Sequence, residues 1–271
     1  MARDLEAALA VAHRLADEAR AAMRAGLADG FGVEHKDDGS PVTEVDRAVE
    51  RALRRAVEQA CPDDGVLGEE FGGASVDALE PWTWVFDPID GTRAFAAGIP
   101  TFTTLIALLH EGRPVLGVID QAVVARRWAA IAGGATRCNG AAVRARSCGE
   151  LGRAILGSTA PQFVPAENRA GFARLEAATR DVQWGGDAFL YGALASGGLD
   201  LVAEAGLALH DFAALAPVVE GAGGRMVDWA GRPLAAGSAG DVLACADPAR
   251  LEEALALLAD GGAGGAEASA T

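Results

Sequence analysis

The segment WVFDPIDGT, residues 84–92, begins as an aromatic-rich strand and then places two carboxylates three residues apart around a proline. Pro88 restricts the backbone and forces a turn after Asp87, so we expect Asp90 to fold back toward Asp87. Two carboxylates held that close repel each other unless a cation lies between them. Mg²⁺ prefers carboxylate and carbonyl oxygens, and the same turn exposes the carbonyl of Ile89. The segment therefore predicts a divalent-cation site at the end of a buried strand.

The two residues after this turn, Gly91 and Thr92, stand where a helix or a second tight turn is expected to begin. Backbone N–H groups at such a start point outward and suit a phosphate group. The alternative for the whole segment is a solvated Asp-Pro turn closed by a side-chain cap, which is a common structure. We favour the metal site because the complete string DPIDGT follows a strand that is predicted to be buried.

Two further groups of acids lie at the ends of predicted elements. Glu69 and Glu70 close the short apolar run VLG, and tandem acids of this kind, taken alone, indicate a solvated loop. Asp46 lies three residues after Thr43 in TEVD, a pattern that predicts a helix cap. An acid in the first turn also lies near the positive end of its helix, so capping and a role in the site are compatible.

A last acid lies in the string ALHDFAALAPVVEGAGG, residues 208–224. Asp211 could cap a helix that begins at Phe212, which is the structural interpretation. Because it would stand at a helix start that follows a strand, it could also face the same cleft as Asp87 and Asp90. The sequence pattern leaves both interpretations open.

Apolar periodicity predicts two α/β halves that meet near residue 150. In the first half we expect a helix from Leu5 that ends in residues 26–32, a loop from His35, a second helix with apolar positions from Val45 to Val57, a strand over 82–87, two strands within 101–123 and a strand pair within 126–140. In the second half we expect helices over 171–180, 187–197, 211–224 and 248–260, and strands over 182–186, 199–206 and 225–234. The chain therefore divides into residues 1–149, residues 150–260 and a tail, 261–271, whose composition predicts disorder.

Composition and charge limit the class of partner. The 271 residues are 51% hydrophobic, with 38 acids against 23 bases and a formal net charge of -15. A surface that acidic repels phosphate backbones and anionic lipids, so nucleic acid and membrane are poor partners and divalent cations are better ones. The N-terminus lacks the unbroken apolar centre of a signal peptide, and the four cysteines show no metal or C-x-x-C spacing. We expect a cytoplasmic protein in a reducing compartment.

These motifs together are similar to those of the inositol monophosphatase family, the Mg²⁺-dependent, lithium-sensitive phosphatases. The matching strings are GEE at 68–70, DPIDGT at 87–92, D-x-A-A at 211–214, EGAGG at 220–224 and KDDGSPVTEVD at 36–46. The resemblance spans residues 36–224, which is most of the folded chain. It implies a layered αβαβα sandwich of the inositol monophosphatase and fructose-1,6-bisphosphatase type, and members of the family are usually homodimers.

The resemblance also implies a ligand set. Glu69, Asp87 and the carbonyl of Ile89 would bind one Mg²⁺, and Asp87, Asp90 and Asp211 would bind a second. The family often shows a third, weaker ion near Glu69. In a two-metal site one ion activates a water for attack on phosphorus and the other stabilises the leaving oxygen.

The same comparison assigns the other catalytic groups. Gly91 and Thr92 would hold phosphate oxygens, and Thr92 would orient or deprotonate the attacking water together with Glu69 and Asp46. No covalent phosphoenzyme is expected, because no cysteine or serine nucleophile is evident in these motifs.

Within the family, the chain looks most like the histidinol-phosphate phosphatase branch. The strings that carry this are SPVTEVDRAVE at 40–50, DPIDGTRAFAAGIP at 87–100, where inositol phosphatases usually read GTTNF, and WGGDAFLYGALASGGLDLVAEAG at 184–206. The small phosphorylated substrate would then be L-histidinol phosphate, with inositol monophosphate or another sugar phosphate as the alternative. A catalytically silent phosphometabolite-binding protein is the alternative from another class.

Four residues are assigned to substrate contacts beyond the phosphate: Lys36, Arg93, Asp187 and Glu204. Histidinol carries an ammonium and an imidazole, which suit the carboxylates of Asp187 and Glu204. Asp187 could instead cap the helix that follows it, and Glu204 suits a polyol as well as an amine. Lys36 is the chain's single lysine, which hints at a role that arginine cannot fill.

Two departures from the family pattern concern the substrate. His210 stands before Asp211 where relatives usually carry Trp or Tyr, and it could contact substrate or metal or serve only as a spacer. Ala188 and Phe189 replace a more usual Cys-Tyr pair. These changes bear on which phosphate ester is bound and leave the predicted metal chemistry as it is.

Overall fold

The structure is a computed structural model that describes residues 3–36, 41–73 and 75–259. The tail over 261–271, for which we predicted disorder, lies outside these ranges. Within them, no helix combines the length and the apolar character needed to cross a bilayer.

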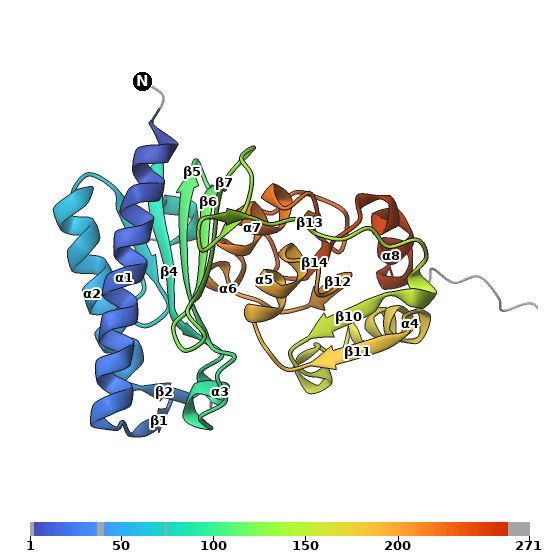
Figure 1. Cartoon of the computed structure of the whole chain (residues 1–271), viewed down its shortest axis with the longest axis horizontal. Coiled ribbons are helices and arrows are strands. Elements are labelled where there is room, and N and C mark those ends of the chain that lie inside the picture. Colours follow the sequence, from blue (N-terminus) through green and yellow to red (C-terminus); the bar gives the residue numbers. More distant parts are fainter. Residues whose placement is uncertain (1–2, 37–40, 74, 260–271) are drawn as a thin grey trace, which may run out of the picture.

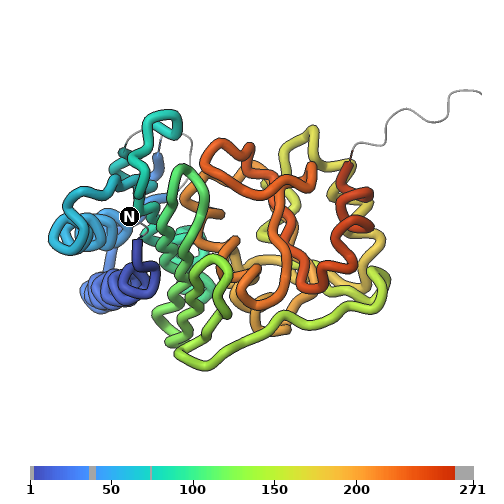
Figure 2. Tube along the Cα trace, turned by 90° about the horizontal axis from the view of Figure 1, so that it is seen from above, coloured from blue at the N-terminus to red at the C-terminus, as the bar shows by residue number. Residues whose placement is uncertain are grey.

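Helices and sheets alternate as helix, sheet, helix, sheet, helix (Figure 1). The two N-terminal helices cover the outer face of the larger sheet, short helices lie between the sheets, and two helices cover the far face of the smaller sheet. Seen from above, the same succession runs from the N-terminal helices to the last helix (Figure 2). Three hydrophobic cores fill the spaces between these layers. The predicted αβαβα sandwich is confirmed.

The outer helices begin at side-chain caps. Helix α1 (Leu5–Asp29) starts after Asp4, whose carboxylate accepts two backbone N–H groups. Helix α2 (Glu44–Ala60) starts with the predicted capping box between Thr43 and Asp46. Each helix buries one apolar face against the larger sheet; the buried positions are Ala8, Ala12, Leu15, Ala16, Ala19 and Met23 on α1 and Val45, Val49, Leu53 and Val57 on α2.

The larger sheet joins seven strands in sequence order from β3 to β9. All neighbours are antiparallel except β3 and β4, which are parallel, so the chain ends of β3 and β4 meet at one edge of the sheet. The strands are β3 (Gly65–Gly68), β4 (Trp82–Asp90), β5 (Thr103–His110), β6 (Arg113–Gln121), β7 (Arg126–Ile131), β8 (Arg137–Cys138) and β9 (Ala141–Ala142).

The strand that carries the DPIDGT motif differs from its prediction. We expected it to end at Asp87, but β4 continues to Asp90. Asp87 lies opposite Leu105 and Asp90 opposite Thr103, so β4 has one more residue than β5 between these pairs and forms a bulge there. Pro88 donates no ladder bond, and the bulge accommodates it without ending the strand. A bulge, rather than an open turn, therefore brings the two acids to the same end of β4.

The smaller sheet has the order β11-β10-β12-β14-β13. Its strands are β10 (Ile155–Ser158), β11 (Asp181–Trp184), β12 (Leu201–Glu204), β13 (Arg225–Asp228) and β14 (Val242–Cys245). Strand β14 was not predicted, because four consecutive buried apolar residues show no alternation. The last strand of the larger sheet ends at Ala142, and the first strand of the smaller sheet begins at Ile155. That the two halves are separate structural units stays a prediction.

The short helices also refine the predictions. They are α3 (Thr92–Ala96), α4 (Arg169–Ala178), α5 (Phe189–Ala195), α6 (Leu209–Phe212), α7 (Leu215–Gly221), α8 (Leu251–Leu258) and the 3₁₀ turns η1 (Val76–Ala78), η2 (Leu151–Arg153), η3 (Pro161–Phe163) and η4 (Pro248–Arg250). The single helix predicted over 211–224 was wrong, since α6 and α7 are separate. Pro217 explains the break. It lies in the first turn of α7, where backbone N–H groups have no partner within the helix, so the absence of its N–H costs no helical hydrogen bond.

A small hairpin precedes α2. Strands β1 (Val33–His35) and β2 (Pro41–Thr43) pair antiparallel, although we expected a loop from His35 to the helix start. Val42 is buried, which anchors β2, but strands this short carry too little pattern to be recognised. Residues 37–40 of the KDDGSPVTEVD motif lie outside the described ranges.

Candidate active site

A cleft of about 910 Å³ opens where the two halves of the chain meet. Most of the residues that we assigned to the site line it: Glu69, Asp87, Ile89, Asp90, Gly91, Thr92, Arg93, Asp187, Glu204 and Asp211. His210 lines it as well, and the Lys36 and Asp46 side chains reach it only through neighbours. The cleft thus gathers acids from β3, β4, β12 and α6, elements far apart in the sequence.

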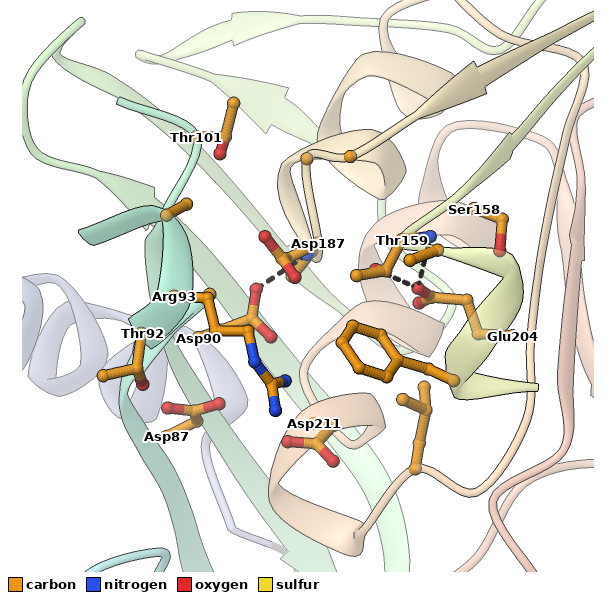
Figure 3. A pocket seen from close by; sticks show the side chains of 18 of the residues that line it. Asp87, Asp90, Thr92, Arg93, Thr101, Ser158, Thr159, Asp187, Glu204 and Asp211 are labelled. Atoms are coloured by element: carbon orange, nitrogen blue, oxygen red, sulfur yellow. Dashed lines mark hydrogen bonds between the residues drawn. The ribbon is translucent and has the colours of Figure 1, made fainter. Parts of the chain in front are cut away.

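Three carboxylates converge at the floor of this cleft. Asp87 and Asp90 come from the bulged end of β4, and Asp211 comes from the first turn of α6 (Figure 3). One oxygen from each lies within 4.8 Å of the others. The expected helix start at Phe212 was wrong, because α6 starts at Leu209. Asp211 still caps this helix, since its carboxylate accepts the N–H of Ala208 at 2.7 Å.

Burial and mutual repulsion raise the pKa of each member of this group. For Asp87, desolvation is the largest cause, followed by the charges of Glu69, Asp90 and Asp211. For Asp90, desolvation raises the pKa, and the Asp187 charge adds to it. The pKa of Asp211 is also raised by burial, and neighbouring His210 opposes this rise. Asp87 is buried and Asp90 and Asp211 are half-buried, and the positive charges near them in the described part of the chain do not prevent their pKa values from rising.

The residues present fit a divalent cation such as Mg²⁺. The donors are hard carboxylate oxygens, and Asp87 Oδ1 is buried without a hydrogen-bond partner in the described part of the chain. Asp87, Asp90 and Asp211 would hold the ion. The carbonyl of Ile89 turns toward the same end of β4, where it accepts the Thr92 hydroxyl at 3.0 Å.

Glu69 stands slightly apart from the three aspartates. It follows β3 in a turn and lines the cleft, but its Oε1 accepts Lys36 Nζ at 2.7 Å. Lys36 also donates to Glu70 Oε1 at 2.7 Å, and these contacts raise the pKa of Lys36 well above its ordinary value despite partial burial. The single lysine therefore bridges the two glutamates after β3 and offsets part of their negative charge.

Asp46 both caps α2 and contacts the predicted phosphate-binding threonine. Its Oδ2 accepts the backbone N–H of Thr43 at 2.8 Å and also the Thr43 hydroxyl. Its Oδ1 lies 3.4 Å from the hydroxyl of Thr92. Burial raises the pKa of Asp46. The two interpretations of this acid therefore hold together: it fixes the start of α2 and reaches the first residue of α3.

Asp187 lies in a turn with unusual backbone geometry. Gly185, Gly186 and Asp187 have φ values of 77°, 118° and 46°, so a non-glycine residue adopts the left-handed conformation. The side chain makes no capping bond to α5, which starts after Ala188. Instead, the metal-site residue Asp90 accepts the N–H of Ala188 at 2.7 Å. The turn is tied to β4 through this bond, and Asp187 is directed over the cleft.

Glu204 is held by two residues that sequence reasoning missed. Its Oε1 accepts the Thr159 backbone N–H at 3.1 Å and the Thr159 hydroxyl, and its Oε2 accepts the hydroxyl of buried Tyr191 at 2.9 Å (Figure 3). Burial raises the pKa of Glu204 to about 6. The only sequence signal was a lone tyrosine in an apolar helix, which requires a hydrogen-bond partner when it is buried.

This raised pKa gives a prediction for stability. The pKa of this carboxyl is 4.5 in the unfolded chain and about 6 in the folded protein. Its contribution to the free energy of unfolding is therefore lost as pH rises through that window. We expect Glu204→Gln to stabilise the metal-free protein by up to about 2 kcal/mol at pH 7 and by much less at pH 4.5. Gln keeps an acceptor for Thr159 and can donate to Tyr191. Urea unfolding in EDTA at both pH values measures this, with the exposed Glu252→Gln as control; an equal effect at both pH values would contradict it.

A cation and an aromatic ring meet across the cleft from opposite halves of the chain. The guanidinium carbon of Arg93 on α3 lies 4.5 Å from the ring centroid of Phe163 in η3. Figure 3 shows the Arg93 side chain reaching into the space between the acids. Phe163 is 42% exposed, which is unusual for a phenylalanine and leaves ring surface accessible from the cleft. Sequence reasoning assigned Arg93 but not Phe163.

Curated relatives include enzymes named for different substrates. Bifunctional phosphatase IMPL2 of Arabidopsis thaliana, a chloroplastic protein, is 40% identical over 229 residues, which are 84% of this chain and 66% of that protein, just under two thirds of its length. Histidinol-phosphatase of Mycobacterium tuberculosis is 37% identical over 229 residues, covering 82% of this chain and 86% of that protein. Inositol-1-monophosphatase SuhB of the same species is 35% identical over 269 residues, 92% of each chain.

Solved structures agree with the sequence relatives. An inositol monophosphatase from Zymomonas mobilis is 43% identical with a TM-score of 0.85, covering 95% of this chain and 99% of that one. An inositol monophosphatase and NADP phosphatase complexed with Mg²⁺ and phosphate shares the fold at 22% identity and a TM-score of 0.77, covering 87% and 89%. The sequence model of the inositol monophosphatase family matches residues 4–261. The chain belongs to the inositol monophosphatase family.

Proposed function

We propose that this protein is a Mg²⁺-dependent phosphomonoesterase that hydrolyses L-histidinol phosphate by attack of water on phosphorus. The observation that carries the phosphatase assignment is the convergence of Asp87, Asp90 and Asp211 beside the start of α3, with an unpartnered buried oxygen on Asp87 within the described part of the chain. A silent binding protein is the less favoured alternative, because the complete set of acids is present in the cleft.

When bound, Mg²⁺ would supply a more acidic water and neutralise charge at the leaving oxygen. The residues of the chain would bind the phosphate and orient the attacking water. Gly91 and Thr92 line the cleft beside the three aspartates and would receive the phosphate oxygens. The Thr92 hydroxyl is oriented by the Ile89 carbonyl and by Asp46, and Glu69, which lines the same cleft, would accept a water proton.

Two observations support an amine with a flat ring as the alcohol part of the substrate. Asp187 and Glu204 place negative charge on the side of the cleft away from α2, which suits the ammonium of histidinol. The exposed face of Phe163 and the planar guanidinium of Arg93 offer surfaces on which an imidazole can stack. Inositol monophosphate is the second candidate, since Glu204 can accept a hydroxyl and the two groups of relatives are 37% and 35% identical.

Phosphate release on a panel of substrates tests this proposal. L-histidinol phosphate, inositol 1-phosphate and adenosine 3′,5′-bisphosphate would be compared with and without Mg²⁺. We expect kcat/KM for histidinol phosphate to exceed the others by ~100-fold, which is about 2.7 kcal/mol. A flat profile would leave the phosphatase and remove the substrate assignment. No release from any of them by folded protein with Mg²⁺ would favour the silent binding protein.

Asp187 gives a narrower prediction. We expect Asp187→Ala to lower kcat/KM for histidinol phosphate by ~10-fold or more, because an ion pair to a partly buried ammonium contributes ~1–3 kcal/mol. Hydrolysis of an aryl phosphate whose alcohol part carries no charge should change less than ~3-fold under the same conditions. Steady-state kinetics on both esters measures the ratio, with Asp181→Ala on the exposed start of β11 as control. Equal losses on both esters would assign Asp187 to shaping its turn.

The remaining assignments are proposals as well. We propose two or three Mg²⁺ ions in the working site, a homodimer, and a place in histidine biosynthesis. The free state of all four cysteines is compatible with the cytoplasmic location that we propose.

A further inference from the structure

Helix α2 carries a polar stripe on the side that faces the ends of β3 and β4. Asp46, Glu50 and Arg54 follow one another at intervals of four residues and therefore share one face of the helix. The first member reaches Thr92 at 3.4 Å, as described above. The second, Glu50, is the last residue of SPVTEVDRAVE; it is 0% exposed and has no role in the proposed chemistry. A fully buried carboxylate requires donors to offset its desolvation.

Glu50 finds these donors in the turn that carries Glu69. Its Oε2 accepts the backbone N–H of Glu70 at 2.7 Å, and its Oε1 lies 3.3 Å from the N–H of Phe71. Arg54 donates Nε to Glu50 at 2.7 Å, and its terminal nitrogen donates to the carbonyl of Gly72. The half-buried ion pair on α2 therefore binds the backbone of residues 70–72.

The start of the turn is shaped around the same carboxylate. A Cβ on Gly68 would lie 2.0 Å from Glu50 Oε1, a distance that no side chain tolerates. Gly68 N–H also closes the turn by donating to the Gly72 carbonyl at 3.0 Å, and the Glu69 N–H donates to Phe86 on β4 at 3.2 Å. Glycine is required at 68 because the helix carboxylate occupies the space where its side chain would be.

We propose that Glu50 is a positioning residue for Glu69 and thereby sets the affinity of the cleft for Mg²⁺. The inference rests on the proposed function and on the ligand role of Glu69 that the family resemblance implies. Lys36 binds the carboxylate ends of Glu69 and Glu70, whereas Glu50 binds the backbone N–H of Glu70 and so ties this turn to α2. A turn released from α2 would leave the Glu69 side chain free to move relative to the three aspartates. Groups that orient metal ligands typically change metal affinity 10–100-fold when removed.

A purely structural role for the Glu50–Arg54 pair makes a different prediction. Loss of the ion pair would then lower the thermal midpoint and leave the Mg²⁺ dissociation constant unchanged. A positioning role weakens Mg²⁺ binding at temperatures where the protein remains fully folded. It also lowers kcat at saturating Mg²⁺, because Glu69 is the proposed acceptor of the water proton, whereas a purely structural role leaves the kcat of the folded protein unchanged.

The test is calorimetric titration of MgCl₂ into substrate-free protein, with steady-state kinetics as the second readout. We expect Glu50→Gln to weaken Mg²⁺ binding ~10-fold and to lower kcat at saturating Mg²⁺, because the turn that carries Glu69 is released. Glu58→Gln, an exposed acid on the same helix, is the matched control and should bind as the wild type does. Asp87→Asn should abolish the binding signal.

Gly68→Ala separates geometry from charge and serves if Glu50→Gln fails to fold. It keeps every charged group but displaces the Glu50 carboxylate, so we expect it to weaken Mg²⁺ binding by a similar factor. Equal Mg²⁺ affinity in wild type and both variants, with Asp87→Asn inactive in binding, would overturn this inference and leave the proposed function intact. Failure of the folded wild type to bind Mg²⁺ at millimolar concentrations would overturn both.

Discussion

Asp87→Asn is expected to lower kcat/KM for every phosphomonoester by ~10³-fold or more, which is about 4 kcal/mol of transition-state stabilisation. Asp87 interacts with the other candidate ligands: its pKa is raised by burial and then by the charges of Glu69, Asp90 and Asp211. A neutral amide in its place would remove the negative charge on which cation binding depends. The measurement is phosphate release over a range of Mg²⁺ concentrations.

The same variant should be more stable than the wild type when no metal is present. Asp87 Oδ1 is buried without a partner in the described ranges, and its charge is repelled by its neighbours. Asn is isosteric, removes the repulsion and can donate to a neighbouring carboxylate, so we expect a gain of about 1–3 kcal/mol at pH 7.5 in EDTA. Mg²⁺ should stabilise the wild type and not the variant. Full activity, or a stability loss comparable to that of a core substitution, would contradict the site assignment.

The acids of the cleft could be predicted because each stands at the end of an element. The ends of β3, β4 and β12 and the start of α6 meet at one edge of the fold, so Glu69, Asp87 and Glu204 arrive together although they are far apart in the chain. Local sequence pattern is enough to predict these acids, since an apolar strand pattern followed by an acid indicates a carboxylate at the end of that strand. The bulge that holds Asp87 near Asp90 was predicted as a turn, because the pairing with β5 is a non-local property.

The residues that hold these acids could not be predicted in the same way. Tyr191 and Thr159 bond Glu204 from α5 and from the loop after β10, and Glu50 bonds the turn after β3 from α2. Each contact joins residues at least 13 positions apart, so no local spacing reports it. Their common sequence signal is a polar group on a buried face, which shows that a partner exists without naming it.

Gly91→Ala is expected to lower kcat/KM ~100-fold or more, because the added Cβ strains the backbone and also clashes with Asp187. Gly91 has φ +82° and lies between the end of β4 and the start of α3. A residue with a side chain would strain the backbone there by about 1 kcal/mol or more. In addition, a Cβ would lie 2.7 Å from Asp187 Oδ2. The clash displaces either the start of α3, which carries Thr92, or the Asp187 turn, and a misplacement of about 1 Å in a site can cost ~100-fold in rate.

A matched glycine separates strain from contact. Gly98 follows α3 with φ +72°, and no atom of the described residues lies within 4 Å of the point that a Cβ would occupy there. Gly98→Ala should lose about 1 kcal/mol of stability in urea unfolding and keep its activity, because it shares the strain and lacks the clash.

The double variant Gly91→Ala, Asp187→Gly completes the test. It removes the contact between the new methyl group and the carboxylate while leaving the strain at position 91, and glycine relieves the φ of 46° at position 187. We expect hydrolysis of an aryl phosphate to recover ~10-fold over Gly91→Ala alone, whereas selectivity for histidinol phosphate stays lost. If Gly98→Ala lost as much activity as Gly91→Ala, or if the double variant recovered nothing, backbone strain and not the approach of Asp187 would explain why glycine stands between the metal motif and α3.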